Sequence, residues 1–130
     1  MADRPLVVLI EPRPARRHHA DTLSSAGFHV VRITAQNASV DRVLAQRPNL
    51  VAEELVTTHL GRTWTFVRLF RERWATRFIP LIVYGHHLRL ADIDAAALAG
   101  ALWLQVAPSD GTRLVAAARG LLLATRATPA

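Results

Sequence analysis

The stretch Leu6-Val-Val-Leu-Ile10, followed at once by Glu11-Pro-Arg-Pro14, decides how the chain folds. Five consecutive apolar residues are typical of a strand that is buried on both faces, as in a parallel sheet. The two prolines end the strand, and Pro14 suits the first turn of a helix. A buried strand that leads directly into a helix is the start of a β–α–β unit and predicts an α/β fold.

The same alternation continues along the rest of the chain. We expect five strands, over residues 6–10, 28–33, 50–55, 79–84 and 101–106. We expect a first helix over 15–26 and a second from a cap at Asn37 or Ser39 to residue 46. A third helix starts at Gly61 and carries Trp64, Val67, Phe70 and Trp74 at helical spacing. A fourth helix covers 90–99, and a fifth runs from a cap at Ser109 or Asp110 to residue 125. Gly27 and Gly100 follow two of these helices as stop signals. The pattern predicts a flavodoxin-like (βα)5 fold, a doubly wound parallel five-stranded sheet of order 2-1-3-4-5, with any site at the carboxyl edge.

Length and composition narrow the class of protein. The chain has 130 residues, which favours a single domain over 1–130, with a core at about 5–125 and a tail at 126–130. Cysteine is absent, which excludes disulfides, thiolate zinc sites and thiol catalysis. All sixteen basic residues are arginine, so Schiff-base lysine chemistry is excluded too. We recognise no targeting or membrane-spanning segment and expect a soluble cytoplasmic protein.

Several fragments carry a resemblance to a known family. They are Val8–Arg17, Ala26–Val30, Pro48–Leu55, Arg68–Arg71, Thr76–Val83, and Ala99–Ala101 with Pro108. In order and spacing they resemble the receiver domain of bacterial response regulators, the CheY-like superfamily, over about residues 5–125. The resemblance implies the same fold and a role in two-component signalling.

The resemblance also shows where this sequence departs from the family. Family members use an aspartate that accepts a phosphoryl group, an acidic pair that holds Mg²⁺, a hydroxyl residue and a lysine. Counting from Pro48 puts Glu54 at the acceptor position, whereas counting back from Gly61 puts Glu53 there. The remaining positions are taken by Glu11-Pro12 for the acidic pair, Gly85 for the hydroxyl and Ala107 for the lysine.

These replacements remove groups that the family's chemistry needs. Mg²⁺ needs several oxygen ligands that converge, and phosphoryl transfer depends on neutralising charge. We therefore expect a degenerate pseudo-receiver that is not an enzyme, has no catalytic residue, needs no cofactor and acts independently of phosphorylation. Two alternatives stay open, namely that Glu54 imitates a phosphorylated aspartate, and that Glu11 with Glu54 keeps residual acceptor or metal activity.

The resemblance places partner binding and dimerisation on the fourth helix, the fifth strand and the fifth helix. The residues expected to contribute there are Leu88, Leu90, Leu102, Trp103, Leu104 and Arg113, with Leu104 at the family's aromatic switch position. We therefore expect a protein partner in a regulatory pathway, or a second copy of the chain.

The basic residues and the histidines suggest further functions. The net charge is +6, and the third helical segment interleaves Arg62, Arg68, Arg71, Arg73 and Arg77 with Trp64, Phe66, Phe70 and Trp74. That pattern suits nucleic acid, but it equally suits an amphipathic helix with its aromatic rings in the core. A second basic cluster joins Arg13, Arg16 and Arg17 with His18 and His19, and we expect it to form a solvated face in preference to an anion-attracting surface. We place His59, His86 and His87 in loops near Glu11 and Glu54, where a histidine–carboxylate metal site is an alternative that we do not favour.

Overall fold

The structure is a computed structural model that describes residues 4–12, 18–55, 60–85, 89–98, 100–105 and 111–127. Five strands form one parallel sheet in the order β2-β1-β3-β4-β5. The predicted α/β fold class and strand order are thereby confirmed. The strands are β1 (Leu6–Glu11), β2 (His29–Thr34), β3 (Leu50–Glu54), β4 (Leu81–Gly85) and β5 (Leu102–Gln105).

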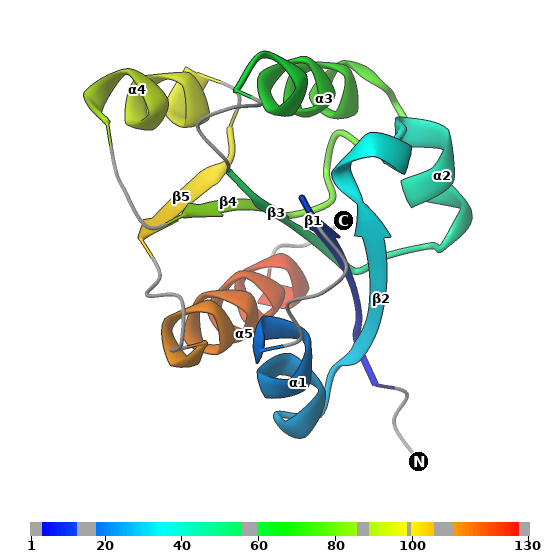
Figure 1. The fold of residues 1–130 in the computed structure, drawn as a ribbon. Coiled ribbons are helices and arrows are strands. Elements are labelled where there is room, and N and C mark those ends of the chain that lie inside the picture. The colour runs from blue at the N-terminus through cyan, green and yellow to red at the C-terminus, as the bar shows by residue number, and fades with distance from the viewer. Residues whose placement is uncertain are drawn as a thin grey trace.

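Helices cover both faces of this sheet, so the molecule has three layers (Figure 1). α1 and α5 pack on one face, and α2, α3 and α4 pack on the other. The helices are α1 (His18–Ser25), α2 (Val40–Ala45), α3 (Leu60–Glu72), α4 (Leu90–Leu98) and α5 (Thr112–Ala127), with a 3-10 turn, η1 (Ala35–Asn37), before α2.

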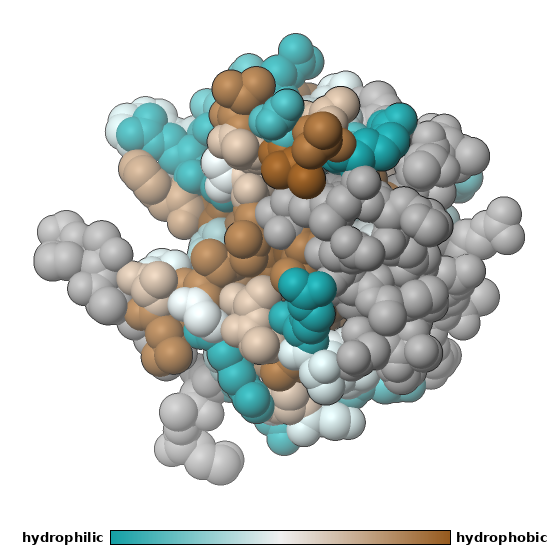
Figure 2. All heavy atoms as spheres, turned by 90° about the vertical axis from the view of Figure 1, so that its left-hand side faces the viewer, coloured by the Kyte–Doolittle hydropathy of each residue, from teal (hydrophilic) through white to brown (hydrophobic). Residues whose placement is uncertain are grey.

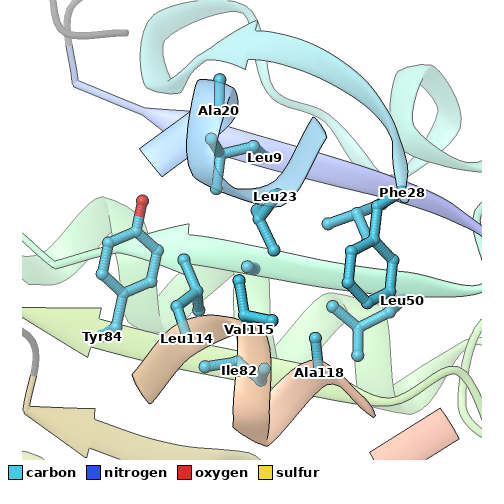
Figure 3. Packing of buried hydrophobic residues seen from close by; sticks show 12 residues of the cluster. Leu9, Ala20, Leu23, Phe28, Leu50, Ile82, Tyr84, Leu114, Val115 and Ala118 are labelled. Atoms are coloured by element: carbon cyan, nitrogen blue, oxygen red, sulfur yellow. The ribbon is translucent and has the colours of Figure 1, made fainter. Parts of the chain in front are cut away.

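The central strands contribute to two separate hydrophobic cores. Successive strand residues point to opposite faces of a sheet. Val7 and Leu9 of β1 therefore pack in the core with α1 and α5, while Val8 and Ile10 pack in the core with the other three helices. Figure 3 shows the first core, where Leu9 lies beside residues of α1 and α5. Burial on both faces is the physical reason for the uninterrupted apolar run in β1.

Local signals in the sequence set several helix ends. Gly27 and Gly100 follow α1 and α4 with positive φ angles of 100° and 68°, as the sequence predicts. Ser39 caps α2, because its Oγ accepts a hydrogen bond from the backbone N–H of Arg42 at 3.1 Å. The alternative cap, Asn37, is wrong, since this residue lies within η1.

The prediction that Trp74 continues the buried face of the third helix is wrong, because α3 ends before it. Hydrogen bonds from Arg71 to backbone carbonyl groups hold the chain where α3 ends. Nη1 of Arg71 donates hydrogen bonds to the carbonyls of Arg77 and Ile79, each at 2.8 Å, and Nη2 donates to the carbonyl of Gly100 at 3.1 Å. Arg71 is therefore a structural residue that holds the loop after α3 against the loop after α4.

Candidate functional site

Three strands deliver their last residues to one edge of the sheet. Glu11 ends β1, Glu54 ends β3 and Gly85 ends β4. Because the strands are parallel, these carboxyl ends lie together, next to the point where the strand order reverses between β1 and β3. The structure thus brings these three sequence-predicted residues to a single edge. Pro12 follows Glu11 there and is half-buried.

The carboxylate of Glu11 is paired inside the protein. Nε of Arg32, on the neighbouring strand β2, donates to Oε1 of Glu11 at 2.6 Å. Glu11 is buried, and its Oε2 has no hydrogen-bond partner within the described ranges. Burial raises the pKa of Glu11, and the negative charge of Glu54 adds to this effect, while Arg32 lowers the pKa and only partly offsets the burial.

Tyr84 lies on the same sheet face as the carboxyl groups of Glu11 and Glu54. It stands beside Glu54 in the β3–β4 register and is buried at the end of the core that Figure 3 shows, near Leu114. The ring of His19 meets the Tyr84 ring edge-on, with 5.4 Å between ring centroids. Burial raises the pKa of Tyr84 well above its usual value, and the charges of Glu54 and Glu11 raise it further. An aromatic ring thus occupies the sheet face that Glu11 and Glu54 share.

Glu53 lies in a different environment from its neighbour Glu54. It is only 2% exposed and lines a pocket on the face of α2 and α3. Burial raises the pKa of Glu53 from 4.5 to about 8, so the carboxyl is protonated at neutral pH. The two adjacent glutamates therefore lie on opposite faces of the sheet and do not form one carboxylate cluster.

Solved structures of signalling domains share this architecture. Chemotaxis protein CheY4 of Vibrio cholerae matches over 91% of this chain and 98% of its own, with a TM-score of 0.76 and 16% identity. The chain has the receiver fold. A CheY-like receiver domain protein from Methanospirillum hungatei matches over 95% and 97% of the two chains, with a TM-score of 0.74 and 13% identity. The signal receiver domain of a histidine kinase from Syntrophus aciditrophicus matches over 97% and 96%, with a TM-score of 0.73 and 18% identity.

The sequence comparisons add no closer relative, since no family model and no curated protein matches the chain. None of the helices in the described ranges has the length and hydropathy that a membrane crossing requires.

Among the described residues, the donors at the carboxyl edge do not suit Mg²⁺, the ion that the receiver fold implies. Mg²⁺ is bound through carboxylate oxygens in a near-octahedral arrangement. One oxygen of Glu11 is taken by the Arg32 guanidinium, Pro12 offers no side-chain oxygen, and Glu53 faces the other side of the sheet. In the described part of the chain, no three His, Cys, Asp or Glu side chains gather as a metal site would require.

Of the histidines that the sequence singles out, one lies in the core and three lie outside the described residues. His19, which we expected in a solvated basic cluster, is buried against Tyr84, so that expectation is wrong. His59, His86 and His87, offered as an alternative metal site, lie outside the described residues, as do Arg13, Arg16 and Arg17.

The sequence left two interpretations of the aromatic residues in the third helical segment, a nucleic-acid surface and a buried helix face, and the structure matches neither completely. Phe66 and Phe70 are buried and stacked, with ring centroids 5.6 Å apart. Trp74 is 77% exposed and Phe78 is 73% exposed. The guanidinium carbon of Arg77 lies 4.0 Å from the centre of the Trp74 ring and 4.7 Å from that of Phe78. The sequence therefore predicts the buried pair and misses an exposed stack of arginine and aromatic rings.

The predicted interaction face contains exposed apolar side chains. Leu90 and Leu102 are exposed, Leu104 is half-buried and Arg113 is exposed. Figure 2, which shows this side of the molecule, has apolar residues over α4, β5 and α5. Leu98 of α4 is 91% exposed and was missed, although a leucine at the end of an alanine-rich helix was a usable signal.

Several predicted residues lie outside the described part of the chain. Leu88 and Ala107, and the expected caps Ser109 and Asp110, lie outside the described residues, as do the side chains of Trp103 and Arg62. Arg32 is the main residue that the sequence reasoning missed. A charged residue in the middle of the run Val30-Val-Arg-Ile-Thr34 was the only available signal.

Proposed function

We propose that this chain is a pseudo-receiver, a signalling module that accepts no phosphoryl group and acts by binding another protein. The ion pair between Arg32 and Glu11 carries this proposal. A carboxylate that is already neutralised by an internal guanidinium has little capacity to hold a divalent cation.

The surroundings of Glu54 support the same proposal. The buried Tyr84 ring fills the sheet face beside it. Gly85 offers no hydroxyl, and the resemblance puts Ala107 where the family has a lysine. Phosphoryl transfer depends on positioning and on neutralising the charge that spreads over the phosphoryl oxygens. Among the positions that the resemblance assigns, this chain therefore lacks the hydroxyl and ammonium donors that would stabilise a phosphoryl group on Glu54.

The test is incubation of the full chain with acetyl phosphate and Mg²⁺, followed by intact-protein mass spectrometry. We expect no phosphoryl adduct on this chain, while a phosphorylation-competent receiver run in parallel is modified. Stoichiometric, Mg²⁺-dependent modification would overturn the proposal, and the variants Glu53→Gln and Glu54→Gln would then identify the acceptor.

A restored variant shows which losses matter. It carries Pro12→Asp, Glu54→Asp, Gly85→Thr and Ala107→Lys. Adding Arg32→Leu to it frees Glu11 from the internal ion pair. We expect modification only after Arg32 is also replaced. Modification of the restored variant with Arg32 in place would show that the ion pair is no obstacle.

The surface that we propose for protein binding is the face of α4, β5 and α5. Leu90, 81% exposed, and Leu98 give α4 two large apolar side chains in solvent, and Leu102 extends the surface onto β5. Exposed apolar residues that cluster on one side of a protein are typical of interaction sites. Arg113 is an exposed charged residue on α5.

We propose a second copy of this chain as one partner for this face. Sedimentation velocity over a range of protein concentrations tests the pairing. We expect a concentration-dependent dimer that Leu98→Arg abolishes and that Leu69→Arg, an equally drastic change on α3, leaves intact. A monomer at all concentrations would exclude self-association, and the face would then be tested against proteins captured from host lysate.

A second candidate function, binding of single-stranded nucleic acid, rests on the Trp74–Arg77–Phe78 stack. Exposed aromatic rings stack on bases, and arginine contributes both charge and cation–π contacts. Fluorescence anisotropy with labelled oligo(dT) at several salt concentrations tests it. We expect salt-dependent binding that Trp74→Ala and Phe78→Ala weaken and that Leu98→Ala does not. Equal binding by all three variants would assign any affinity to net charge alone.

A further inference from the structure

A pocket of about 440 Å³ opens between η1, α2 and α3, and nothing in the proposed function uses it. Pockets that bind small molecules typically have volumes of about 300–1,000 Å³. The pocket has a simple origin in the chain. α2 has only 6 residues, and Ala35 and Ala38 bring very short side chains to its edge, so the space beside α3 is not filled.

The walls of this pocket are mainly apolar. Val40 lines it from α2, and Phe66 and Leu69 line it from α3. Its rim carries charge of both signs, since Asp41 and Arg73 also line the pocket and form an ion pair with each other. The rim charges therefore largely compensate one another, and the site as a whole favours a neutral ligand over an ion.

One polar group of the pocket lining is left without a partner. Oε1 of Glu53 is buried and accepts no hydrogen bond from any residue in the described ranges. A buried polar atom without a partner costs stability, and such atoms are uncommon in folded proteins. Burial raises the pKa of Glu53 to about 8, so its carboxyl group is neutral at neutral pH.

We propose that this pocket binds a small, neutral, mostly aromatic molecule that makes a hydrogen bond to the carboxyl group of Glu53. An aryl amide has the required chemistry, because its ring suits the walls formed by Phe66 and Leu69 and its amide both donates and accepts. A cationic ligand is disfavoured, since it would have to give up its hydration in an apolar cavity. The pocket shares its sheet face with α4, but its lining residues come from none of α4, β5 and α5.

The test uses the full chain and two probes of similar shape, benzamide and isopropylbenzene, which has no polar group. Titrations followed by ¹H–¹⁵N NMR report which backbone amides move. For benzamide we expect saturable shifts confined to Ala35, Ala38, Phe66 and their neighbours, with affinity about 3- to 10-fold higher than for isopropylbenzene, the ratio expected from one hydrogen bond.

Three variants separate the hydrogen bond from the cavity. Glu53→Leu removes the polar group, and we expect it to bind benzamide about 3- to 10-fold more weakly. Ala38→Leu fills the pocket while keeping Glu53, and we expect it to abolish binding of both probes. Glu72→Gln, an exposed change on α3, is the control and binds as the parent does.

Several outcomes would overturn the proposal. Absence of saturable shifts would mean that the pocket holds only water, and unchanged binding by Ala38→Leu would place the probe elsewhere. Equal affinity for both probes would mean that Glu53 makes no hydrogen bond to the ligand. This comparison uses the parent chain, so it does not depend on the folding of a variant. Tighter binding of benzamidine than of benzamide would overturn the neutral class of ligand.

Discussion

The buried carboxyl of Glu53 makes the stability of the domain depend on pH in a direction that can be tested. Its pKa is about 8 in the folded protein against an ordinary value of 4.5. The folded state therefore holds this proton more tightly than the unfolded state does. The stabilising contribution is fully present below the unfolded pKa of 4.5 and is lost as pH rises through the folded pKa of about 8.

The size of the effect follows from these two values. One pKa unit corresponds to about 1.36 kcal/mol, so raising the pH from about 5 to about 7.5 removes roughly 3 kcal/mol. A small domain has a total stability of only about 5–15 kcal/mol, so this loss is large. The glutamine in Glu53→Gln has no proton to lose in this pH range, so the free energy of unfolding of this variant does not fall by this amount.

The assay is urea unfolding at a series of pH values, followed by far-ultraviolet circular dichroism. The parent and Glu53→Gln share all other titrating groups, so the difference between their free energies of unfolding isolates Glu53. We expect that difference to shift by roughly 3 kcal/mol in favour of the variant between about pH 5 and pH 7.5. Glu72→Gln controls for loss of a surface carboxyl. A difference independent of pH would refute the reasoning, because it would mean that Glu53 titrates alike in both states.

Three further predictions concern groups that hold the fold. Arg32→Leu leaves Glu11 buried without its ion pair and should cost about 2 kcal/mol in chemical denaturation, less than a fully buried pair because Arg32 is partly exposed. Adding Glu11→Leu should restore most of it, and a double variant as unstable as the single one would contradict the assigned pair. Thr76→Val removes the hydrogen bond from Oγ1 to the carbonyl of Phe70 at 2.6 Å and should cost about 1–2 kcal/mol, whereas Thr76→Ser keeps the donor and most of the stability. Arg47→Gly should raise the thermal midpoint by stabilising the protein about 0.5–1 kcal/mol, since Arg47 has a φ angle of 51°, and Arg47→Ala, which keeps a Cβ, should not.

The fold was predictable because its main signals are local. Apolar runs such as Val7–Ile10 and Leu81–Tyr84 are buried on both faces and admit few arrangements other than the interior of a parallel sheet. Gly27 and Gly100 end helices where a left-handed residue is needed. At Arg47 the same backbone conformation is adopted without glycine, and the sequence carried no signal for it.

The errors have a non-local origin. The spacing of aromatic residues continues to Trp74, but α3 stops earlier, and Arg71 at its end binds one carbonyl group of the loop that follows and the carbonyl group of Gly100, beyond α4. The pairing of Arg32 with Glu11 depends on the β1–β2 register, which places Arg32 beside Leu9 on the face that Glu11 also uses. Neither contact can be derived from neighbours in the sequence, since each joins residues of different elements.

The two adjacent glutamates show why sequence alone left the site ambiguous. Counting from either side assigned the acceptor position to Glu53 or to Glu54, and both counts are consistent with a strand. A shift of one residue in a strand moves a side chain to the other face of the sheet. Glu54 therefore shares a face with Glu11 and Tyr84, whereas Glu53 lines the α2–α3 pocket. Because the two environments are separated by the sheet itself, a phosphoryl adduct on Glu54 would overturn the pseudo-receiver and leave the pocket untouched. Failure of benzamide to bind would overturn the proposed ligand site and leave the pseudo-receiver proposal untouched.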